Sequence, residues 1–274
     1  MLFYKIIKKN THKEWVVLLH GLGGSSNIWF KQLRAFKKEF NILMVDLRGH
    51  GGSRHLSGEF SEYDWELVSR DIIAVLRENK ISKAHFVGIS LGTLLIRKIN
   101  LLRPDMVKSM ILGGSITKFN KRGRFLIKIG HIMKSKVPYM WLYKFFAWIL
   151  MPKRNHYDSR MMFVKEAKNL SQEEFIKWFD LTSHIDNLYD DYYKETPNTP
   201  ILYLMGEEDH MFINEVNRCM KQEKMSELVI IEKTGHVCNV DASERFNEMA
   251  VRFIKKQSSF IDTTERIKEH LNNH

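Results

Sequence analysis

The chain has 274 residues, of which 44% are apolar and 27% are charged, and its formal net charge is +11. This length and composition suit one globular domain that carries an insertion, and two cysteines, Cys219 and Cys238, are too few for a disulfide framework. No run of about eighteen uncharged apolar residues and no secretory signal core is present, so we expect a cytoplasmic protein without a membrane span.

Apolar runs and helical patterns alternate along most of the chain. Strands are predicted near 3–8, 15–20, 41–46, 84–89, 107–113, 200–205 and 227–232, and helices near 27–38, 63–79, 91–102, 213–222 and 241–256. The apolar runs are nearly continuous, as expected of strands that are buried on both faces. The alternation predicts an α/β fold with a mostly parallel sheet and helices on both faces.

A glycine-rich loop, His20-Gly21-Leu22-Gly23-Gly24, follows the second predicted strand. Backbone N–H groups of such a loop can point at an oxyanion that develops during acyl transfer. We assign this oxyanion hole to the N–H groups of Leu22 and of Leu91, the residue after Ser90. The next aromatic residue, Trp29, is expected to add apolar lining to a substrate pocket.

The segment Gly88-Ile89-Ser90-Leu91-Gly92 joins the fourth predicted strand to a helical pattern. A serine on such a strand–turn–helix is held in a strained backbone conformation, with its hydroxyl clear of the sheet edge. The flanking glycines are expected where a side chain would collide with a neighbouring strand or helix. Ser90 is therefore the candidate nucleophile.

Polar residues also follow the last two predicted strands. Asp209 ends an acidic loop after the sixth strand, and His236 follows the seventh. The order Ser90, Asp209, His236 matches the nucleophile, acid and base of one class of serine hydrolase. Glu207 and Glu208 compete with Asp209 for the acid role. None of the other eleven histidines lies between the last strand and the final long helix, so His236 is the expected base.

Together, these segments resemble the α/β-hydrolase superfamily. The resemblance covers about residues 4–256 and rests on residues 20–24, 46–51, 88–92, 209 and 235–236. It implies a Ser-Asp-His triad, no cofactor, and hydrolysis of esters or related acyl bonds. Asp46, Arg48 and His50 are then expected to support loop structure and pocket shape. Only about fourteen residues precede Trp15, so one edge of the sheet is expected to be a strand short.

The resemblance also implies a helical cap, inserted before the sixth strand. The stretch 117–196 fits a cap, because it is rich in helix-compatible residues and lacks short glycine-bounded strands. Within it, Ser171 and Glu174 have the spacing of a capping box at a helix start. We expect a hydrolase core of residues 1–116 and 197–256, a cap of residues 117–196, and a peripheral tail of residues 257–274.

The whole formal excess of charge lies in this cap. Residues 118–168 contain thirteen Lys or Arg and two acids, a net of +11, so the rest of the chain is neutral. Within that segment, residues 137–151 hold six aromatic side chains and one lysine, a run too short to span a membrane. Trp141, Phe145 and Trp148 are expected to roof the substrate pocket.

Three interpretations of the basic, aromatic cap remain open. In the first, the apolar face of the cap roofs the pocket while its lysines face water. In the second, the cap also docks on an anionic membrane. In the third, it binds an acidic carrier protein whose acyl chain enters beneath the cap. Nucleic acid is not expected, because no recognisable binding motif accompanies the basic residues. No metal is expected either, because histidines and cysteines at zinc spacing are absent from the sequence.

These observations predict a serine hydrolase that cleaves carboxylic esters with hydrophobic acyl or alkyl groups through an acyl-enzyme. One alternative is a lyase or C–C hydrolase acting on a small carboxylated substrate, and another is an esterase for acyl groups on an acidic carrier protein. A non-catalytic ligand-binding module is a third alternative, and the complete triad argues against it.

Overall fold

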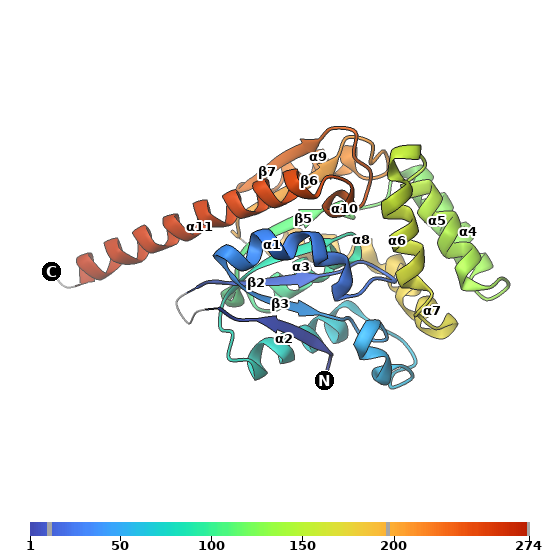
Figure 1. Ribbon diagram of the computed structural model, residues 1–274, viewed down its shortest axis with the longest axis horizontal. Coiled ribbons are helices and arrows are strands. Elements are labelled where there is room, and N and C mark those ends of the chain that lie inside the picture. Colours follow the sequence, from blue (N-terminus) through green and yellow to red (C-terminus); the bar gives the residue numbers. More distant parts are fainter. Residues whose placement is uncertain (10–12, 196–197, 273–274) are drawn as a thin grey trace.

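The computed structural model describes residues 1–9, 13–195 and 198–272. A seven-stranded sheet in the order β1-β3-β2-β4-β5-β6-β7 forms its centre (Figure 1). The strands are β1 (Tyr4–Ile7), β2 (Trp15–Leu19), β3 (Asn41–Val45), β4 (Ala84–Ile89), β5 (Val107–Gly113), β6 (Ile201–Gly206) and β7 (Ser226–Ile231). Every neighbouring pair is parallel except β1 and β3. The predicted fold class is therefore confirmed, with a single antiparallel strand at the N-terminal edge.

Eleven α-helices accompany the sheet in the described part of the chain. They are α1 (Phe30–Glu39), α2 (Trp65–Glu78), α3 (Leu91–Leu102), α4 (Lys121–Met133), α5 (Tyr139–Leu150), α6 (Tyr157–Ala167), α7 (Gln172–Leu181), α8 (Ile185–Glu195), α9 (Ile213–Met220), α10 (Cys238–Asp241) and α11 (Ser243–Asn272). None of the described helices is both long and apolar enough to cross a membrane.

Both faces of the sheet are buried. Successive strand residues point to opposite faces, so Val17 and Leu19 of β2 pack in one core cluster while Val16 and Leu18 pack in the other. The first cluster includes residues of α2, α3 and α8, and the second includes residues of α1 and α11. Because β2 to β7 run parallel, their carboxyl ends meet at one edge of the sheet, where loops from several strands can share a site.

Helices α4 to α7 lie together at one side of the molecule, beside the carboxyl ends of the strands (Figure 1). The Ser171 hydroxyl accepts the N–H of Glu174 at 3.1 Å, as the capping pattern predicts. The Glu174 carboxylate does not complete the box, because it is buried and accepts hydrogen bonds from Tyr63 and from the N–H of Gly58. This carboxylate therefore joins the cap to the loop that follows β3.

Helix α8 was predicted as part of the cap, but it packs against the core. Its Tyr189 and Tyr192 rings face the guanidinium of Arg97 in α3, at 5.0 and 4.6 Å from the ring centroids. Arg97 is fully buried and its Nη1 lies 2.8 Å from Oε1 of Glu223. A buried cation needs such partners, so α8 is fixed to the core by this cage. The expected boundary between cap and core, at 196–197, lies outside the described residues.

The C-terminal helix runs on into the segment that is predicted as a peripheral tail. Helix α11 continues without interruption from Ser243 to Asn272, past the predicted end at residue 256. Its first half packs against α1 and the sheet through residues such as Phe246 and Phe253. Its second half projects away from the rest of the molecule (Figure 1). The last two residues of the predicted tail, 273–274, lie outside the described residues.

Candidate active site

Ser90 forms a sharp turn between β4 and α3. Its φ of 53° and ψ of −122° lie outside the regions that residues with a side chain favour. Gly92 allows this turn to press against the neighbouring strand, because a Cβ at that position would lie 2.3 Å from the carbonyl oxygen of Leu19 in β2. The strained turn presents the Ser90 hydroxyl to the loops that follow β6 and β7.

His236 lies within hydrogen-bond distance of both Ser90 and Asp209. Ser90 Oγ is 2.9 Å from Nε2 of His236, and Nδ1 of the same ring is 2.8 Å from Oδ2 of Asp209. The three residues are 5%, 0% and 1% exposed, in the order Ser90, His236, Asp209. A carboxylate only accepts hydrogen bonds, so in the neutral ring Nδ1 carries the proton and Nε2 accepts from the serine hydroxyl. This is the arrangement of a general base next to a nucleophile.

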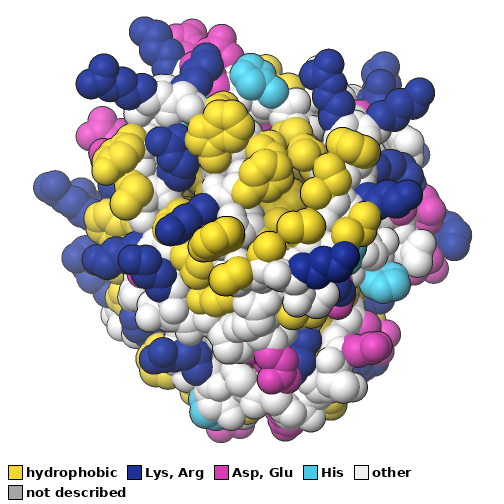
Figure 2. All heavy atoms as spheres, turned by 90° about the vertical axis from the view of Figure 1, so that its right-hand side faces the viewer, with side chains coloured by type: hydrophobic (Ala, Val, Ile, Leu, Met, Phe, Trp, Pro, Cys, Tyr) yellow, Lys and Arg dark blue, Asp and Glu magenta, His cyan; other side chains and the backbone are white. Residues whose placement is uncertain are grey.

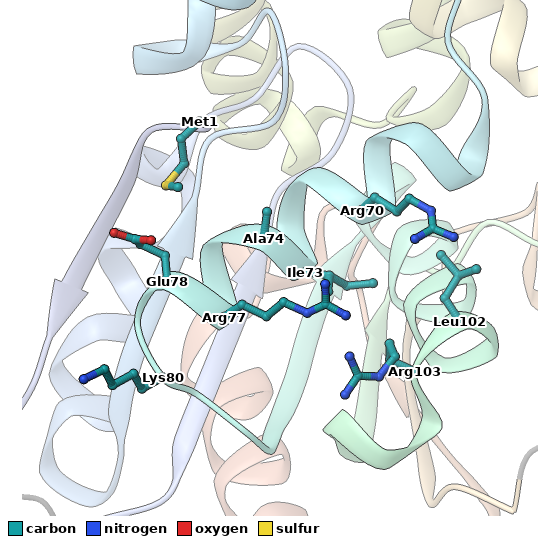
Figure 3. Close-up of a pocket in the computed structure, with 9 residues that line it drawn as sticks. All are labelled: Met1, Arg70, Ile73, Ala74, Arg77, Glu78, Lys80, Leu102 and Arg103. Atoms are coloured by element: carbon teal, nitrogen blue, oxygen red, sulfur yellow. The ribbon is translucent and has the colours of Figure 1, made fainter.

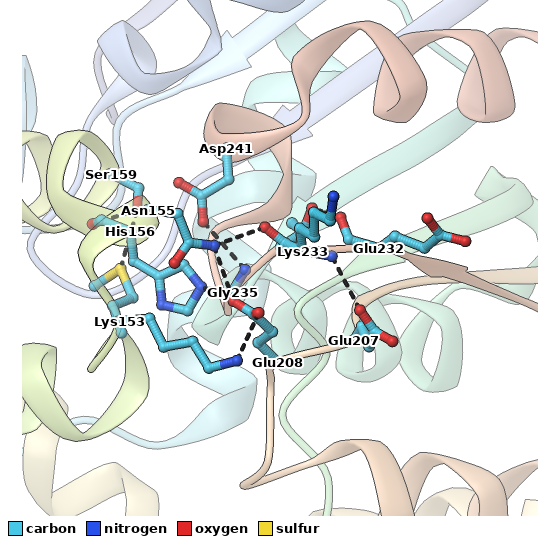
Figure 4. A network of polar contacts seen from close by, with 12 residues as sticks. Lys153, Asn155, His156, Ser159, Glu207, Glu208, Glu232, Lys233, Gly235 and Asp241 are labelled. Carbon is cyan, nitrogen blue, oxygen red and sulfur yellow. Dashed lines mark hydrogen bonds and ion pairs between the residues drawn. The ribbon is translucent and has the colours of Figure 1, made fainter.

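Glu207 and Glu208, which compete with Asp209 in the sequence, bind elsewhere. Glu207 accepts the N–H of Lys233 at 3.1 Å. Glu208 accepts from three side chains of the cap: Lys153 at 2.7 Å, Asn155 at 2.9 Å and His156 at 2.7 Å (Figure 4). The hydrogen bonds from Asn155 and Lys153 lower the pKa of Glu208 to about 2. Asp209 is therefore the carboxylate that the structure places against the imidazole.

The contacts of Glu208 brace the two loops that carry the acid and the base. Glu208 directly precedes Asp209 in the loop after β6. Asn155 donates a second hydrogen bond, at 2.9 Å, to the carbonyl of Lys233 in the loop that leads to His236. The 3₁₀ turn Arg154–His156 at the start of α6 is thus tied to both loops. This network could not be predicted from the sequence, because its partners are separated by 53 and 78 residues along the chain.

The predicted oxyanion loop lies beside Ser90. Leu22 and Leu91 both line the cavity into which Ser90 opens. Leu91 is the first residue of α3, where a backbone N–H has no acceptor within the helix and the helix dipole favours negative charge. A Cβ on Gly21 would lie 3.0 Å from Cβ of Ser90, which shows how closely this loop approaches the serine. Both predicted donors are therefore next to the candidate nucleophile.

Two buried histidines hold the oxyanion loop in place. Nε2 of His50 accepts the N–H of Gly23 at 2.9 Å, and Nε2 of His20 accepts the N–H of Leu47 at 3.0 Å. Each Nδ1 lies within 2.9 Å of a backbone carbonyl oxygen. Because a backbone N–H can only donate, both rings are neutral and carry their proton on Nδ1. His50 is predicted to support loop structure, and in the structure it contacts the glycine-rich loop through the hydrogen bond that its Nε2 accepts from Gly23.

These neutral histidines make stability depend on pH. Burial lowers the pKa of both rings, and that of His50 falls from 6.5 to about 3. Between these values the unfolded chain binds a proton that the folded chain does not, so the free energy of unfolding falls as the pH falls below about 6.5. We expect a loss of up to about 1.4 kcal/mol per pH unit from His50.

Urea unfolding of the native protein and of His50→Gln measures this loss. The glutamine amide oxygen can accept the N–H of Gly23 but does not titrate. We expect the stability advantage of the native protein over His50→Gln to shrink as the pH is lowered from about 7 to about 5. A difference that stays constant over this range would contradict the assignment.

A narrow apolar cavity of about 100 Å³ opens at Ser90 beneath the cap. Its lining includes Phe119, Leu126, Tyr143, Phe146, Phe175 and Phe212. None of the described residues that line it carries a charge. The Tyr143 hydroxyl is occupied, because it donates to the carbonyl of Leu22 at 2.8 Å. The cavity therefore suits an uncharged apolar group attached to the reacting carbonyl.

The four aromatic residues predicted to line the pocket do not line it. Trp29 is fully buried in the core, with its ring centroid 6.4 Å from that of Phe246. Trp141, Phe145 and Trp148 are 69%, 42% and 59% exposed and point away from the cavity. Helix α5 does roof the cavity, but through its opposite side.

A larger hollow of about 590 Å³ lies away from the triad, next to Met1 and α2 (Figure 3). Arginines dominate its polar lining, and Arg70 and Arg103 are paired with Glu66 and Asp105 at 2.6 Å. The residues described there include no serine, cysteine or histidine. No group of three His, Cys, Asp or Glu side chains is arranged to hold a metal ion in the part of the chain that the structure describes.

Comparison with known proteins agrees with this architecture. A family model described as the alpha/beta hydrolase fold matches residues 14–135, which include the oxyanion loop and Ser90. The solved structure of a carboxylesterase of the thaumarchaeon Nitrososphaera gargenis has a TM-score of 0.78 over 94% of this chain and 95% of that chain, at 18% identity. The chain has the α/β-hydrolase fold. Asp209 and His236 lie beyond the segment that the family model matches.

Two relatives in sequence differ in the activity that their names give. The (E)-2-((N-methylformamido)methylene)succinate hydrolase of Acinetobacter baylyi is 24% identical over 243 residues, which are 86% of this chain and 88% of that protein. The pimeloyl-[acyl-carrier protein] methyl ester esterase of Pseudoalteromonas atlantica is 33% identical over 105 residues, 38% of each protein.

Proposed function

We propose that this hydrolase cleaves carboxylic esters with a hydrophobic acyl or alkyl group, and that Ser90 is its nucleophile. The observation that carries the proposal is the pair of hydrogen bonds that joins Ser90 to His236 and His236 to Asp209, at the mouth of an uncharged apolar cavity. An activated serine beside two backbone N–H donors is the arrangement that acyl transfer requires.

In the proposed reaction, Ser90 Oγ attacks the ester carbonyl carbon while Nε2 of His236 takes the hydroxyl proton. The oxyanion accepts hydrogen bonds from the N–H groups of Leu22 and Leu91, and Asp209 stabilises the imidazolium. His236 then gives its proton to the leaving alkoxide, and the acyl group stays on Ser90. Water attacks this acyl-enzyme with His236 as base, which releases the acid and restores the serine.

The cavity argues against a carboxylated substrate as the group bound beneath the cap. A carboxylate buried without a cation or several hydrogen-bond donors costs several kcal/mol. The described lining supplies only Ser90, Thr182 and the occupied Tyr143 hydroxyl as polar side-chain groups. A lyase or C–C hydrolase acting on a small carboxylated substrate therefore fits this site less well than an esterase.

An esterase for acyl groups on an acidic carrier protein is the second candidate. The observation that favours it is the net charge of +11 in residues 118–168, which adjoin the cavity. The name of the Pseudoalteromonas relative mentions an acyl-carrier protein. The chemistry at Ser90 would be the same, so the two candidates differ only in what lies beyond the acyl chain.

A series of p-nitrophenyl esters tests the proposal. We expect kcat/KM to rise about fourfold per added methylene from acetate upward until the cavity is filled, because each buried methylene contributes about 0.8 kcal/mol. The hemisuccinate ester should be a poorer substrate than the butyrate ester, because its carboxylate would be buried without a partner. A preference for the hemisuccinate, or no turnover of any ester, would contradict the proposal.

Two adjacent residues of α4 provide a matched pair of variants for this series. Leu126 lines the cavity, whereas Phe125 is 65% exposed. Leu126→Ala should enlarge the cavity and shift the optimum to longer acyl chains, and Phe125→Ala should leave the optimum unchanged. Equal effects of the two variants would show that the acyl group does not bind beneath the cap.

A further inference from the structure

The outer surface of the cap carries a concentration of exposed apolar side chains. Fourteen large hydrophobic residues are exposed in the described part of the chain, and half of them lie between residues 125 and 161. We refer to these seven as the cap face: Phe125, Ile132, Trp141, Phe145, Trp148, Tyr157 and Met161. Figure 2 shows hydrophobic side chains gathered on this side of the molecule, surrounded by lysines and arginines.

Helix α5 is the clearest case, because it is apolar on two sides. Its inner side is buried through residues that include Leu142 and Ala147. Its outer side carries Trp141, Lys144, Phe145 and Trp148, spaced three and four residues apart and therefore aligned along the helix. A helix that is hydrophobic all round is normally covered on all sides. The outer side of α5 has no such cover among the described residues, which indicates a partner surface.

Most of the charged side chains in residues 118–168 are basic, and most of these basic side chains form no ion pair with a described acid. Of the thirteen basic residues in 118–168, four form ion pairs with acids in the structure: Lys118, Arg124, Lys134 and Lys153. No ion pair joins the other nine to a described acid. Eight of these nine are exposed: Lys121, Arg122, Lys128, Lys136, Lys144, Arg154, Lys165 and Lys168. The partner surface should therefore be negatively charged and apolar at once.

We propose that the cap face docks on the surface of an anionic lipid bilayer. Tryptophan and tyrosine favour the boundary between lipid headgroups and acyl chains, because their rings are apolar and their N–H or O–H groups are polar. Basic residues around them bind anionic headgroups. A helix that lies in the interface uses the same combination of aromatic residues and lysines. An acidic protein would match the basic residues, but ion pairing alone leaves Trp141 and Trp148 exposed.

Docking in this orientation brings the cavity close to the bilayer. Helices α4 and α5 line the cavity with Leu126, Phe146 and Ile149, and carry Phe125 and Trp148 on their exposed side. An ester dissolved in the membrane would then enter beneath the cap without crossing much water. This consequence rests on the proposed function, whereas docking itself does not depend on catalysis.

Co-sedimentation with vesicles tests the docking. The test uses vesicles of phosphatidylcholine alone and of phosphatidylcholine with phosphatidylglycerol, at low and high salt, with the native protein and with Ser90→Ala. Both proteins should bind the anionic vesicles at low salt, bind less at high salt, and bind neutral vesicles weakly. Equal binding by Ser90→Ala separates docking from catalysis, so a failure of ester hydrolysis would leave this test intact.

Variants of the cap face locate the binding surface. Lys136→Gln with Lys144→Gln should weaken binding to anionic vesicles about 25-fold, at about fivefold per lysine. Trp141→Ser with Trp148→Ser should weaken it by about tenfold or more. Matched controls lie on α1: Lys37→Gln with Lys38→Gln removes the same charge, and Phe30→Ser removes a side chain that is 55% exposed. The controls should change binding less than about twofold.

Three outcomes would overturn the proposal, provided that thermal unfolding shows native stability in each variant. The first is the absence of binding to anionic vesicles. The second is binding that the cap variants and the α1 controls weaken equally. The third is binding to an acidic acyl carrier protein, lost in the cap variants, by a chain that does not bind vesicles.

Discussion

Replacing Ser90 with alanine is expected to lower kcat for ester hydrolysis by about 10⁶-fold. The variant lacks the oxygen that lies 2.9 Å from Nε2 of His236, so no acyl-enzyme can form. The fold should remain, because alanine keeps the Cβ at the strained turn and removes the one hydrogen bond that joins Ser90 Oγ to His236. We expect the free energy of unfolding to change by less than about 1 kcal/mol. Steady-state kinetics with a p-nitrophenyl ester and urea unfolding measure both quantities.

Ser115→Ala is a matched control for this loss. Ser115 is a fully buried serine just after β5, at the same edge of the sheet, and its hydroxyl has no hydrogen-bond partner among the described residues. Its replacement should leave kcat close to the native value. Activity retained by Ser90→Ala would point to another nucleophile, and a comparable loss in Ser115→Ala would attribute the effect to packing.

Replacing Asp209 with asparagine is expected to lower kcat by about 10⁴-fold. The carboxylate accepts the Nδ1 proton of His236 at 2.8 Å and thereby leaves Nε2 free to accept from Ser90. An amide can present its N–H₂ to Nδ1 instead, which favours the tautomer with a proton on Nε2. That tautomer cannot remove the serine proton. The same ester assay measures the loss, with thermal unfolding as the check on the fold.

Glu207→Gln and Glu208→Gln are the controls for this variant. Both residues precede Asp209, and their carboxylates bind Lys233 or the cap rather than the imidazole. We expect each to retain at least about one-tenth of the native kcat, because neither touches the reacting groups. A loss in either variant as large as that in Asp209→Asn would move the acid role to that glutamate.

The meeting of Ser90, Asp209 and His236 beside the glycine-rich loop could be anticipated, because each of these residues belongs to a local sequence pattern. Ser90, Asp209 and His236 each follow a short apolar strand, and the carboxyl ends of parallel strands meet at one edge whatever the distance along the chain. The sheet order was not needed for this inference. It required only the alternation of strands and helices, which the apolar periodicity shows.

The lining of the cavity was predicted wrongly, because α5 is apolar almost all round and its aromatic residues are spread over both sides. The one charged residue of the helix, Lys144, lies on the same side as Trp141, Phe145 and Trp148, and it is the signal that this side faces outward. The structure turns Tyr143 and Phe146 inward. Trp29 was misplaced for a similar reason, since closeness to the oxyanion loop in sequence says nothing about the direction of a side chain.

Contacts between segments that are far apart along the chain could not be predicted from the sequence either. The hydrogen bonds of Glu208 with Asn155 and His156 form only once the cap and the core are packed, and the tyrosines meet Arg97 only once α8 is packed on α3. Nothing in the sequence distinguishes these residues from ordinary surface or helix residues. The exposed side of α5 is the part of the cap that the packing of this chain does not explain, and it carries the membrane proposal.

The most direct test of the central claim is mass spectrometry of the native protein after reaction with a fluorophosphonate. The probe forms a covalent adduct only with an activated serine, so one adduct per chain is expected, on the peptide that contains Ser90. The adduct should form slowly or not at all in Asp209→Asn. An adduct on a different residue, or none in protein that is folded by circular dichroism, would contradict the account.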